Sequence, residues 1–221
     1  MTKTLLPPHP TARHASATDS GHDPRKEVRT QEQRSQQTRI GLLEAASICI
    51  GQHGYAGLRL SDIAMQAGVT IGALQHHFLD KDDLMRQVVA CAYEELRSSV
   101  EQQAQASGPI AERVAGSVAL MRTIYHSAKV AAAFEIIYAK RDDKAFLKTL
   151  APAFQSADAL MDQAWQTRFA DSGKDPATLA ALRHFARTTI QGLHIQRRVN
   201  PGFDEEEVIT VLSTMLLQNL S

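Results

Sequence analysis

The chain has 221 residues, and its 24 Lys plus Arg balance 24 Asp plus Glu, so its formal net charge is zero. Net charge therefore excludes neither nucleic acid nor another partner. A chain of this length, with 43% apolar residues, can bury a core without disulfides or metals as staples. Gly and Pro are few, and Ala, Leu and Gln are abundant, which favours an all-α fold.

The apolar runs of the sequence are short. The longest, such as 130–134 and 215–217, fall far below the roughly 20 residues that a membrane-spanning helix needs. Near the N-terminus only Leu5 and Leu6 precede two prolines, which is too little for the apolar core of a secretion signal. We therefore expect a cytoplasmic protein that makes no membrane contact.

Residues 1–34 are rich in Pro, His, Ser, Thr, Asp and Arg and have almost nothing to bury, so we expect a disordered N-terminal arm. The end of this arm and the start of the next segment are basic, with Arg25, Lys26, Arg29, Arg34 and Arg39. Two interpretations are open: a solvated linker, or a basic arm that touches the phosphate backbone of DNA.

The next segment, 35–83, predicts a small helical domain. Apolar residues at Ile40, Leu43, Ala46 and Ile50 recur at helical spacing, and Gly54 is expected to end this first helix. A second helix is expected from an N-cap at Ser61 to about Ala67, and a third from an N-cap at Thr70 to about Phe78.

The second and third predicted helices are so close in sequence that they must cross steeply. Ala64 permits a close approach, Gly68 can adopt the positive φ of the turn, and Ile63, Val69 and Leu74 can fill a shared core. This pattern is typical of a helix-turn-helix. The third helix would then expose small groups and neutral hydrogen bonders, which suit a major groove about 12 Å wide: Thr70, Ile71, Gly72, Ala73, Gln75 and His76.

Phosphate contacts are expected around this unit from cations and from helix starts, where backbone N–H groups are free. Asp80 is expected to cap a fourth helix, which brings its first turn close to the end of the third. The candidates are the cations Arg39, Arg59 and Lys81, together with Ser61 and Thr70.

Many residues within 39–84 occur at fixed spacings from one another, and this pattern is far more specific than a helix-turn-helix pattern alone. The residues are Ala45, Ala46, Gly54, Tyr55, Asp62, Ile63, Ala64, Ala67, Gly68, Val69, Gly72, Leu74, Phe78, Lys81 and Leu84. This pattern strongly resembles the N-terminal DNA-binding domain of TetR-family transcriptional regulators. One position departs from it, because the family usually carries Tyr where this chain has Gln75. Gln75 could hydrogen-bond a phosphate or an adenine edge.

The resemblance implies that residues 84–221 form a larger helical domain that binds a small molecule and dimerises. The sequence itself predicts successive helices, bounded by Gly, Pro and Asp signals, at 81–104, 110–126, 128–140, 143–171, 176–199 and 204–219. In the last helix apolar residues cover about half of the circumference, wider than a surface helix needs. Candidates for a four-helix dimer interface are Leu182, Phe185, Ile190, Leu193, Val208, Leu212, Met215 and Leu216.

Aromatic and Met residues on the middle helices could line an apolar ligand cavity or simply form core. The apolar candidates are Met121, Tyr125, Phe134, Tyr138, Met161, Trp165, Phe169 and Phe185, and the candidate polar anchors are Arg122, His126 and His184.

The sequence offers little for a metal, a cofactor or catalysis. The histidines lack HExxH or ExxH spacing, and neither a GxSxG elbow, a Walker A loop nor a GxGxxG turn is present. Paired acids such as 142–143 fit helix starts better than catalysis. We expect no metal site, no cofactor and no enzymatic activity.

The predicted function is a ligand-responsive repressor that binds a near-palindromic double-stranded operator as a homodimer and is released by a small-molecule inducer. A dimeric all-α protein-interaction module without DNA binding is the alternative, kept open by Gln75. An enzyme is the remaining and least favoured class.

Overall fold

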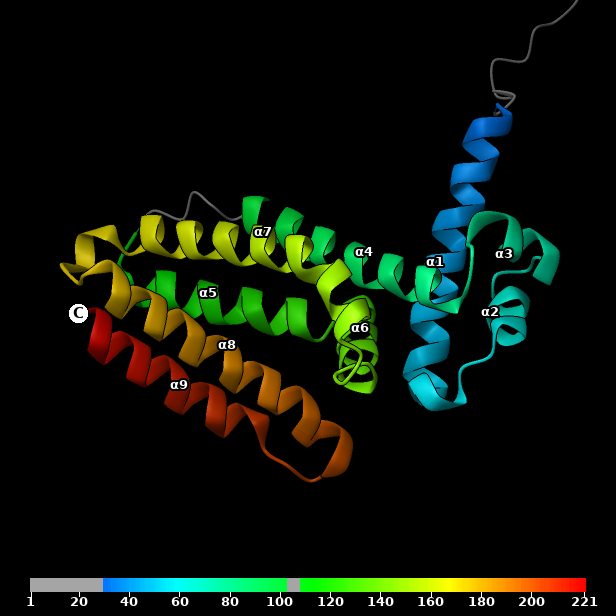
Figure 1. Ribbon diagram of the computed structural model, residues 1–221. Helices are drawn as coiled ribbons and strands as arrows, with labels where there is room; N and C mark the ends of the chain where they lie inside the picture. The colour runs from blue at the N-terminus through cyan, green and yellow to red at the C-terminus, as the bar shows by residue number, and fades with distance from the viewer. Residues whose placement is uncertain (1–29, 103–107) are drawn as a thin grey trace, which may run out of the picture.

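The computed structural model describes residues 30–102 and 108–221, which fold into α-helices and one short 3-10 helix without a strand in these ranges (Figure 1). The part of the predicted arm that covers residues 1–29 lies outside the described residues. The helices are α1 Gln31–Gly57, α2 Leu60–Gln66, α3 Ile71–His77, α4 Lys81–Gln102, α5 Ile110–Tyr125, α6 Ala128–Ala139, α7 Lys144–Arg168, η1 Ala170–Ser172, α8 Pro176–Val199 and α9 Glu205–Leu220.

Helix α1 begins earlier than predicted. Thr30 and Gln33 form a capping box, in which the Thr30 hydroxyl accepts from the Gln33 N–H at 3.2 Å and the Gln33 side chain accepts from the Thr30 N–H at 2.8 Å. Residues 31–34, assigned above to a disordered arm, are therefore helical. Gly54 was expected to end this helix; its φ of 66° breaks the helical backbone there, but α1 continues beyond the kink to Gly57. Ile40 does not share the buried face, since about half of its side chain is exposed while Leu42 is fully buried.

Helices α2 and α3 form the predicted helix-turn-helix. Gly68 has φ 68°, the Val69 N–H donates to the Ala64 carbonyl at 3.0 Å, and Ile63 and Leu74 are buried. The N-cap prediction for α2 is wrong by two residues. The carbonyl of Arg59, whose backbone is extended, accepts the first helical hydrogen bonds, so Ser61 lies inside α2.

Helices α4 to α9 make up the rest of the fold. The boundaries of these helices follow the signals predicted from the sequence. Carboxylates of Asp143, Asp175 and Asp204 accept backbone N–H groups at the starts of α7, α8 and α9. Figure 1 shows α4 running from the helix-turn-helix into this domain, with α8 and α9 side by side along one edge. None of the helices in the described ranges is long and apolar enough to cross a membrane.

The two domains pack through α1, which contacts both α4 and α6. Ion pairs join the helices on which α1 packs, and one hydrogen bond reaches α1 itself. Lys140, at the end of α6, donates to Asp82 on α4 at 2.9 Å. This hydrogen bond is the largest of the causes that raise the pKa of Lys140 to about 12. Arg198 on α8 pairs with Glu135 at 3.2 Å and donates to the Gly51 carbonyl of α1 at 3.4 Å. The DNA-binding unit is therefore tied to α4, α6 and α8.

Candidate nucleic-acid interface and ligand cavity

Helix α3 presents the surface predicted for a recognition helix. The Thr70 hydroxyl caps it by accepting from the Ala73 N–H at 3.2 Å, and Leu74 and the following Phe78 are buried beneath it. Its exposed positions carry no carboxylate: Ile71, Gly72, Gln75 and His76. Ala73 is half-buried. This surface can approach a base-pair edge without charge repulsion from the phosphates.

His77 is the last residue of α3, and its ring lies 6.4 Å from the ring of the buried Phe78. It is half-buried, and desolvation, followed by the charges of His76 and Arg39, lowers the pKa of its imidazole. This position agrees with the interpretation that His76, and not His77, faces the groove.

The three candidate phosphate-binding cations differ in their surroundings. Arg59 is exposed at the start of α2. The exposed Arg39 extends from α1 to α4, where its Nε donates to the Gln87 amide oxygen at 3.0 Å, and its guanidinium lies 6.0 Å from the centre of the Phe78 ring. Arg39 therefore both stabilises the DNA-binding unit and keeps its charge at the surface.

Lys81 is less free than the sequence predicts. Its ammonium donates to the Leu58 carbonyl at 2.9 Å and lies 4.7 Å from the centre of the Tyr55 ring. Desolvation lowers the pKa of Lys81. This lysine therefore holds the connector between α1 and α2 against the first turn of α4.

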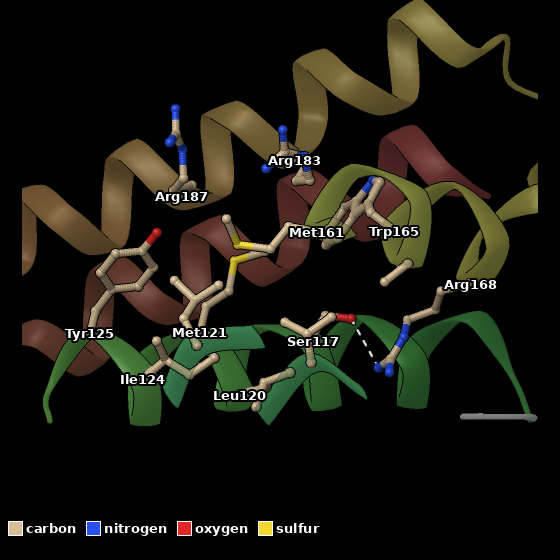
Figure 2. Close-up of a pocket in the computed structure, with 13 residues that line it drawn as sticks. Ser117, Leu120, Met121, Ile124, Tyr125, Met161, Trp165, Arg168, Arg183 and Arg187 are labelled. Carbon is tan, nitrogen blue, oxygen red and sulfur yellow. Dashed lines mark hydrogen bonds between the residues drawn. The ribbon is translucent and has the colours of Figure 1, made fainter. Parts of the chain in front are cut away.

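A cavity of about 60 Å³ lies among α4, α5, α7 and α8. Four of the predicted ligand-binding residues line it: Met121, Tyr125, Met161 and Trp165. Figure 2 shows Tyr125 at one end and Arg168 at the other, with both Met thioethers reaching into the space between α5 and α8. Side chains of the cavity wall thus occupy much of the space that a ligand would need.

Two of the predicted polar anchors lie outside this cavity. Arg122 and Arg197 form ion pairs with the buried Glu205, at 2.8 and 3.4 Å, and the His126 ring lies 3.4 Å from the same carboxylate. The cluster ties the ends of α5 and α8 to the start of α9. The position beside the Glu205 carboxylate is therefore more favourable for these side chains than a position inside the apolar cavity.

The remaining predicted ligand contacts are also located elsewhere. Phe134 lines a second, smaller cavity of about 40 Å³, and Phe169 is wholly buried against Trp165, with ring centres 4.6 Å apart. Tyr138 is exposed on α6, and Phe185 is exposed on α8. The ring nitrogens of His184 lie 3.4 and 3.3 Å from the guanidinium groups of Arg183 and Arg187 and do not line the cavity.

Sequence reasoning missed three arginines in the cavity wall, Arg168, Arg183 and Arg187. Arg183 is only 2% exposed, and it donates to Asp158 at 2.9 Å and to Asp162 at 3.1 Å. A signal was present, because cations at 183 and 187 and acids at 158 and 162 repeat at the four-residue spacing of one helical face. No group of three or more His, Cys, Asp and Glu within the described ranges is placed to hold a metal ion.

The eight candidates for the dimer interface divide by burial. Ile190, Leu193, Leu212 and Leu216 are buried within the chain and so pack in its own core. Leu182 and Val208 are half-buried. Phe185 on α8 and Met215 on α9 are 40% and 43% exposed, and Val211 on α9 is 53% exposed. We define Phe185, Val211 and Met215, three exposed apolar residues of these two adjacent helices, as the α8–α9 face; Ile195 and Val199 are also exposed, toward the C-terminal end of α8.

Together, the capped α3, the Gly68 turn that joins it to α2 and its exposed face without a carboxylate define a DNA-binding regulator of the helix-turn-helix class. Residues 42–88 match the family model described as bacterial regulatory proteins, tetR family. An uncharacterized HTH-type transcriptional regulator of Mycobacterium tuberculosis is 30% identical over 197 residues, covering 87% of this chain and 100% of that protein.

Solved structures share the fold. A transcriptional regulator from Rhodococcus superposes with a TM-score of 0.66 at 18% identity, over 82% of this chain and 95% of that one. A TetR-family transcriptional regulator from Mesorhizobium loti gives a TM-score of 0.63 at 16% identity, over 85% and 96%. The chain belongs to the TetR family and is a transcriptional regulator, not an enzyme.

Proposed function

We propose that this protein is a repressor that binds a near-palindromic operator as a homodimer and is released by a small-molecule inducer. Two α3 helices related by a two-fold axis would enter major grooves about one helical turn, or roughly 34–36 Å, apart. The α8–α9 face supports the dimer, because apolar side chains exposed on adjacent helices are typical of interfaces.

The observation that carries the proposal is the path of α4. Its first turns belong to the core beneath the helix-turn-helix, where Leu84, Met85 and Val88 are fully buried. Its later turns supply Leu96 and Val100 to the cavity wall. One continuous helix therefore connects the candidate ligand site to the DNA-binding unit.

The small size of the cavity supports a change of conformation when a ligand binds. Ligand sites usually enclose roughly 300–1,000 Å³, whereas this cavity holds about 60 Å³. A ligand must therefore displace wall side chains and the helices behind them, and it binds a different conformation more tightly than this one. A preference of that kind shifts the dimer away from the geometry that fits the operator.

Fluorescence anisotropy with DNA from the region upstream of the protein's own gene tests DNA binding, and sedimentation of the complex gives its stoichiometry. We expect saturable binding of a dimer, with affinity that falls steeply as salt rises. A reporter under the same promoter should be more active when the gene is deleted. Absence of binding, with the protein folded and dimeric, would favour the protein-interaction module that Gln75 leaves open.

A further inference from the structure

Helix α3 exposes one face. Successive residues of a helix point about 100° apart, so its four exposed residues lie within an arc of about 140°, in the angular order Ile71, Gln75, Gly72 and His76. Leu74, outside this arc, is only 1% exposed. Figure 1 shows α3 at the outer edge of the helix-turn-helix, away from α5 and α9.

Gln75 and Gly72 occupy the centre of this face. Gly72 has no side chain, so the backbone can approach a groove closely, and the long side chain of Gln75 projects furthest from the centre. A side chain at the centre of a helix face meets the floor of the major groove, where the base edges lie, whereas the flanks meet the phosphate walls. Gln75 is therefore placed to contact a base.

The amide group of Gln75 selects among the bases. Its oxygen accepts a hydrogen bond and its nitrogen donates. Adenine presents the complement in the major groove, an N6–H donor beside the N7 acceptor, and a Gln amide can bond both at once. Guanine presents two acceptors, O6 and N7, one of which would face the amide oxygen. Gln75 therefore favours adenine.

Residues suited to guanine are scarce in this unit. Arg and Lys are the usual bidentate partners of guanine, and residues 60–80, which span α2, the turn and α3, contain neither. His76 lies at a flank of the exposed face, and a neutral imidazole donates a single N–H. The side chains of α3 are thus better suited to A·T pairs than to G·C pairs.

Ile71 adds an apolar contact beside Gln75. Its side chain is 47% exposed at the first residue of α3, four residues before Gln75 and on the same side of the helix. The C5-methyl of thymine is the apolar group that base edges present in the major groove. Four residues rise about 6 Å along a helix, which is about two base-pair steps of 3.4 Å.

From this arrangement we infer that Gln75 and Ile71 determine operator specificity. Gln75 makes two hydrogen bonds to the N6 and N7 edge of an adenine, and Ile71 covers the methyl group of a thymine within about two base pairs of it. The inference rests on the proposed function for the entry of α3 into the groove. It assigns Gln75 to a base and not to a phosphate.

Selection of duplexes from a random pool by the full chain gives the preferred half-site without knowledge of the operator. We expect two A·T pairs within about two base pairs of each other in each half. Half-sites specified by G·C pairs alone would contradict the inference.

Anisotropy then compares the selected duplex with two chemically altered duplexes. In one half-site, 7-deazaadenine replaces each preferred adenine in turn and removes only the N7 acceptor, or uracil replaces each preferred thymine and removes only the methyl group. We expect one adenine at which binding weakens about tenfold, as for loss of a bidentate contact. We expect one thymine at which it weakens about fourfold, as for one buried methyl group. Unchanged affinity at every position overturns the inference.

Two variants assign these effects to their side chains. Gln75→Ala should bind the adenine and 7-deazaadenine duplexes equally, and Ile71→Ala should bind the thymine and uracil duplexes equally. Gln52→Ala and Ile48→Ala, at exposed positions of α1, are the matched controls and should keep both preferences. If Gln75→Ala weakens both adenine duplexes by the same factor, Gln75 contacts a phosphate. If Ile71→Ala still distinguishes thymine from uracil, another group contacts the methyl.

Failure of the proposed function gives a different result. A pool from which no sequence is enriched contradicts both the operator and this inference. An enriched palindromic site whose affinity ignores both base changes retains the operator and contradicts the inference alone.

Discussion

The ammonium group of Lys81 donates a 2.9 Å hydrogen bond to the backbone carbonyl of Leu58, across the junction between the α1–α2 connector and α4. An ammonium has three N–H donors, so this contact leaves two for another acceptor. Lys81 can therefore hold the connector and still reach a phosphate from the first turn of α4. The two roles are separable by experiment.

Lys81→Met keeps an apolar stem against Tyr55 and removes the charge. We expect the slope of log affinity against log salt to fall by about 1, alike for all DNA sequences, because one phosphate contact is lost. Loss of the Leu58 hydrogen bond should lower the free energy of unfolding by about 1 kcal/mol. Anisotropy over a salt series and urea denaturation measure the two effects. An unchanged slope with reduced stability would assign Lys81 to the fold alone.

Gly72 lies on the exposed face of α3, and a Cβ there would meet only the Thr70 hydroxyl, at 3.8 Å. Gly72→Leu should leave the fold intact or stabilise it by up to about 1 kcal/mol, since Gly is a poor helix former. The same side chain should block entry into the groove and abolish operator binding. Circular dichroism and anisotropy measure the two outcomes. Gly51→Leu, at an exposed position whose carbonyl faces Arg198, is the control that should retain binding.

Phe185 and Met215 are the exposed apolar residues that we assign to the dimer. Phe185→Glu should shift the protein to monomer at micromolar concentration in sedimentation velocity, because two buried carboxylates would face each other across the two-fold axis. Tyr138→Glu places the same charge on the exposed surface of α6 and should leave the dimer intact. A dimeric Phe185→Glu protein would move the interface away from the α8–α9 face.

Stability should fall as pH drops from about 6.5 toward 5. Burial is the largest cause that lowers the pKa of both His126 and His194. Each imidazole is therefore harder to protonate in the folded chain, and the unfolded chain binds more protons below its ordinary pKa near 6.5. Carboxylates with lowered pKa, such as Asp83 and Asp171, lose their contribution only at lower pH.

Urea denaturation at successive pH values from 7.5 to 5 measures this dependence, at about half-unit intervals. His194→Gln should reduce the slope in this window and change stability little at pH 7.5. The interpretation fails if the wild-type unfolding free energy is constant across the window.

Local signals explain why most of the fold was predictable. A helix start depends on one side chain within three residues, so Thr70, Asp143 and Asp175 mark their helices in any context. The start of α1 was missed because Thr30 lies in a polar stretch with no apolar periodicity after it. Ser61 misled because it precedes an acid, whereas the extended backbone of Arg59 decides where α2 begins.

The candidate site was less predictable because burial of a charge depends on partners far along the chain. Arg183 is buried only because Asp158 and Asp162 face it from α7. Arg122 and His126 lie outside the cavity, beside Glu205 from the start of α9, which is far from them in the sequence. Apolar residues were placed better, since Met121 and Met161 need only a shared helical face to meet.

The 22 residues of α4 make a rod about 33 Å long. If this rod pivots by about 5° near Leu96, about 22 Å from its first residue, its far end moves by about 2 Å, more than half of the 3.4 Å rise of one base pair. Two such rods act in a dimer, and their displacements add or cancel along the DNA axis. An expansion of a few ångströms around Leu96 and Val100 is thus enough to put the two recognition helices out of register with a fixed operator.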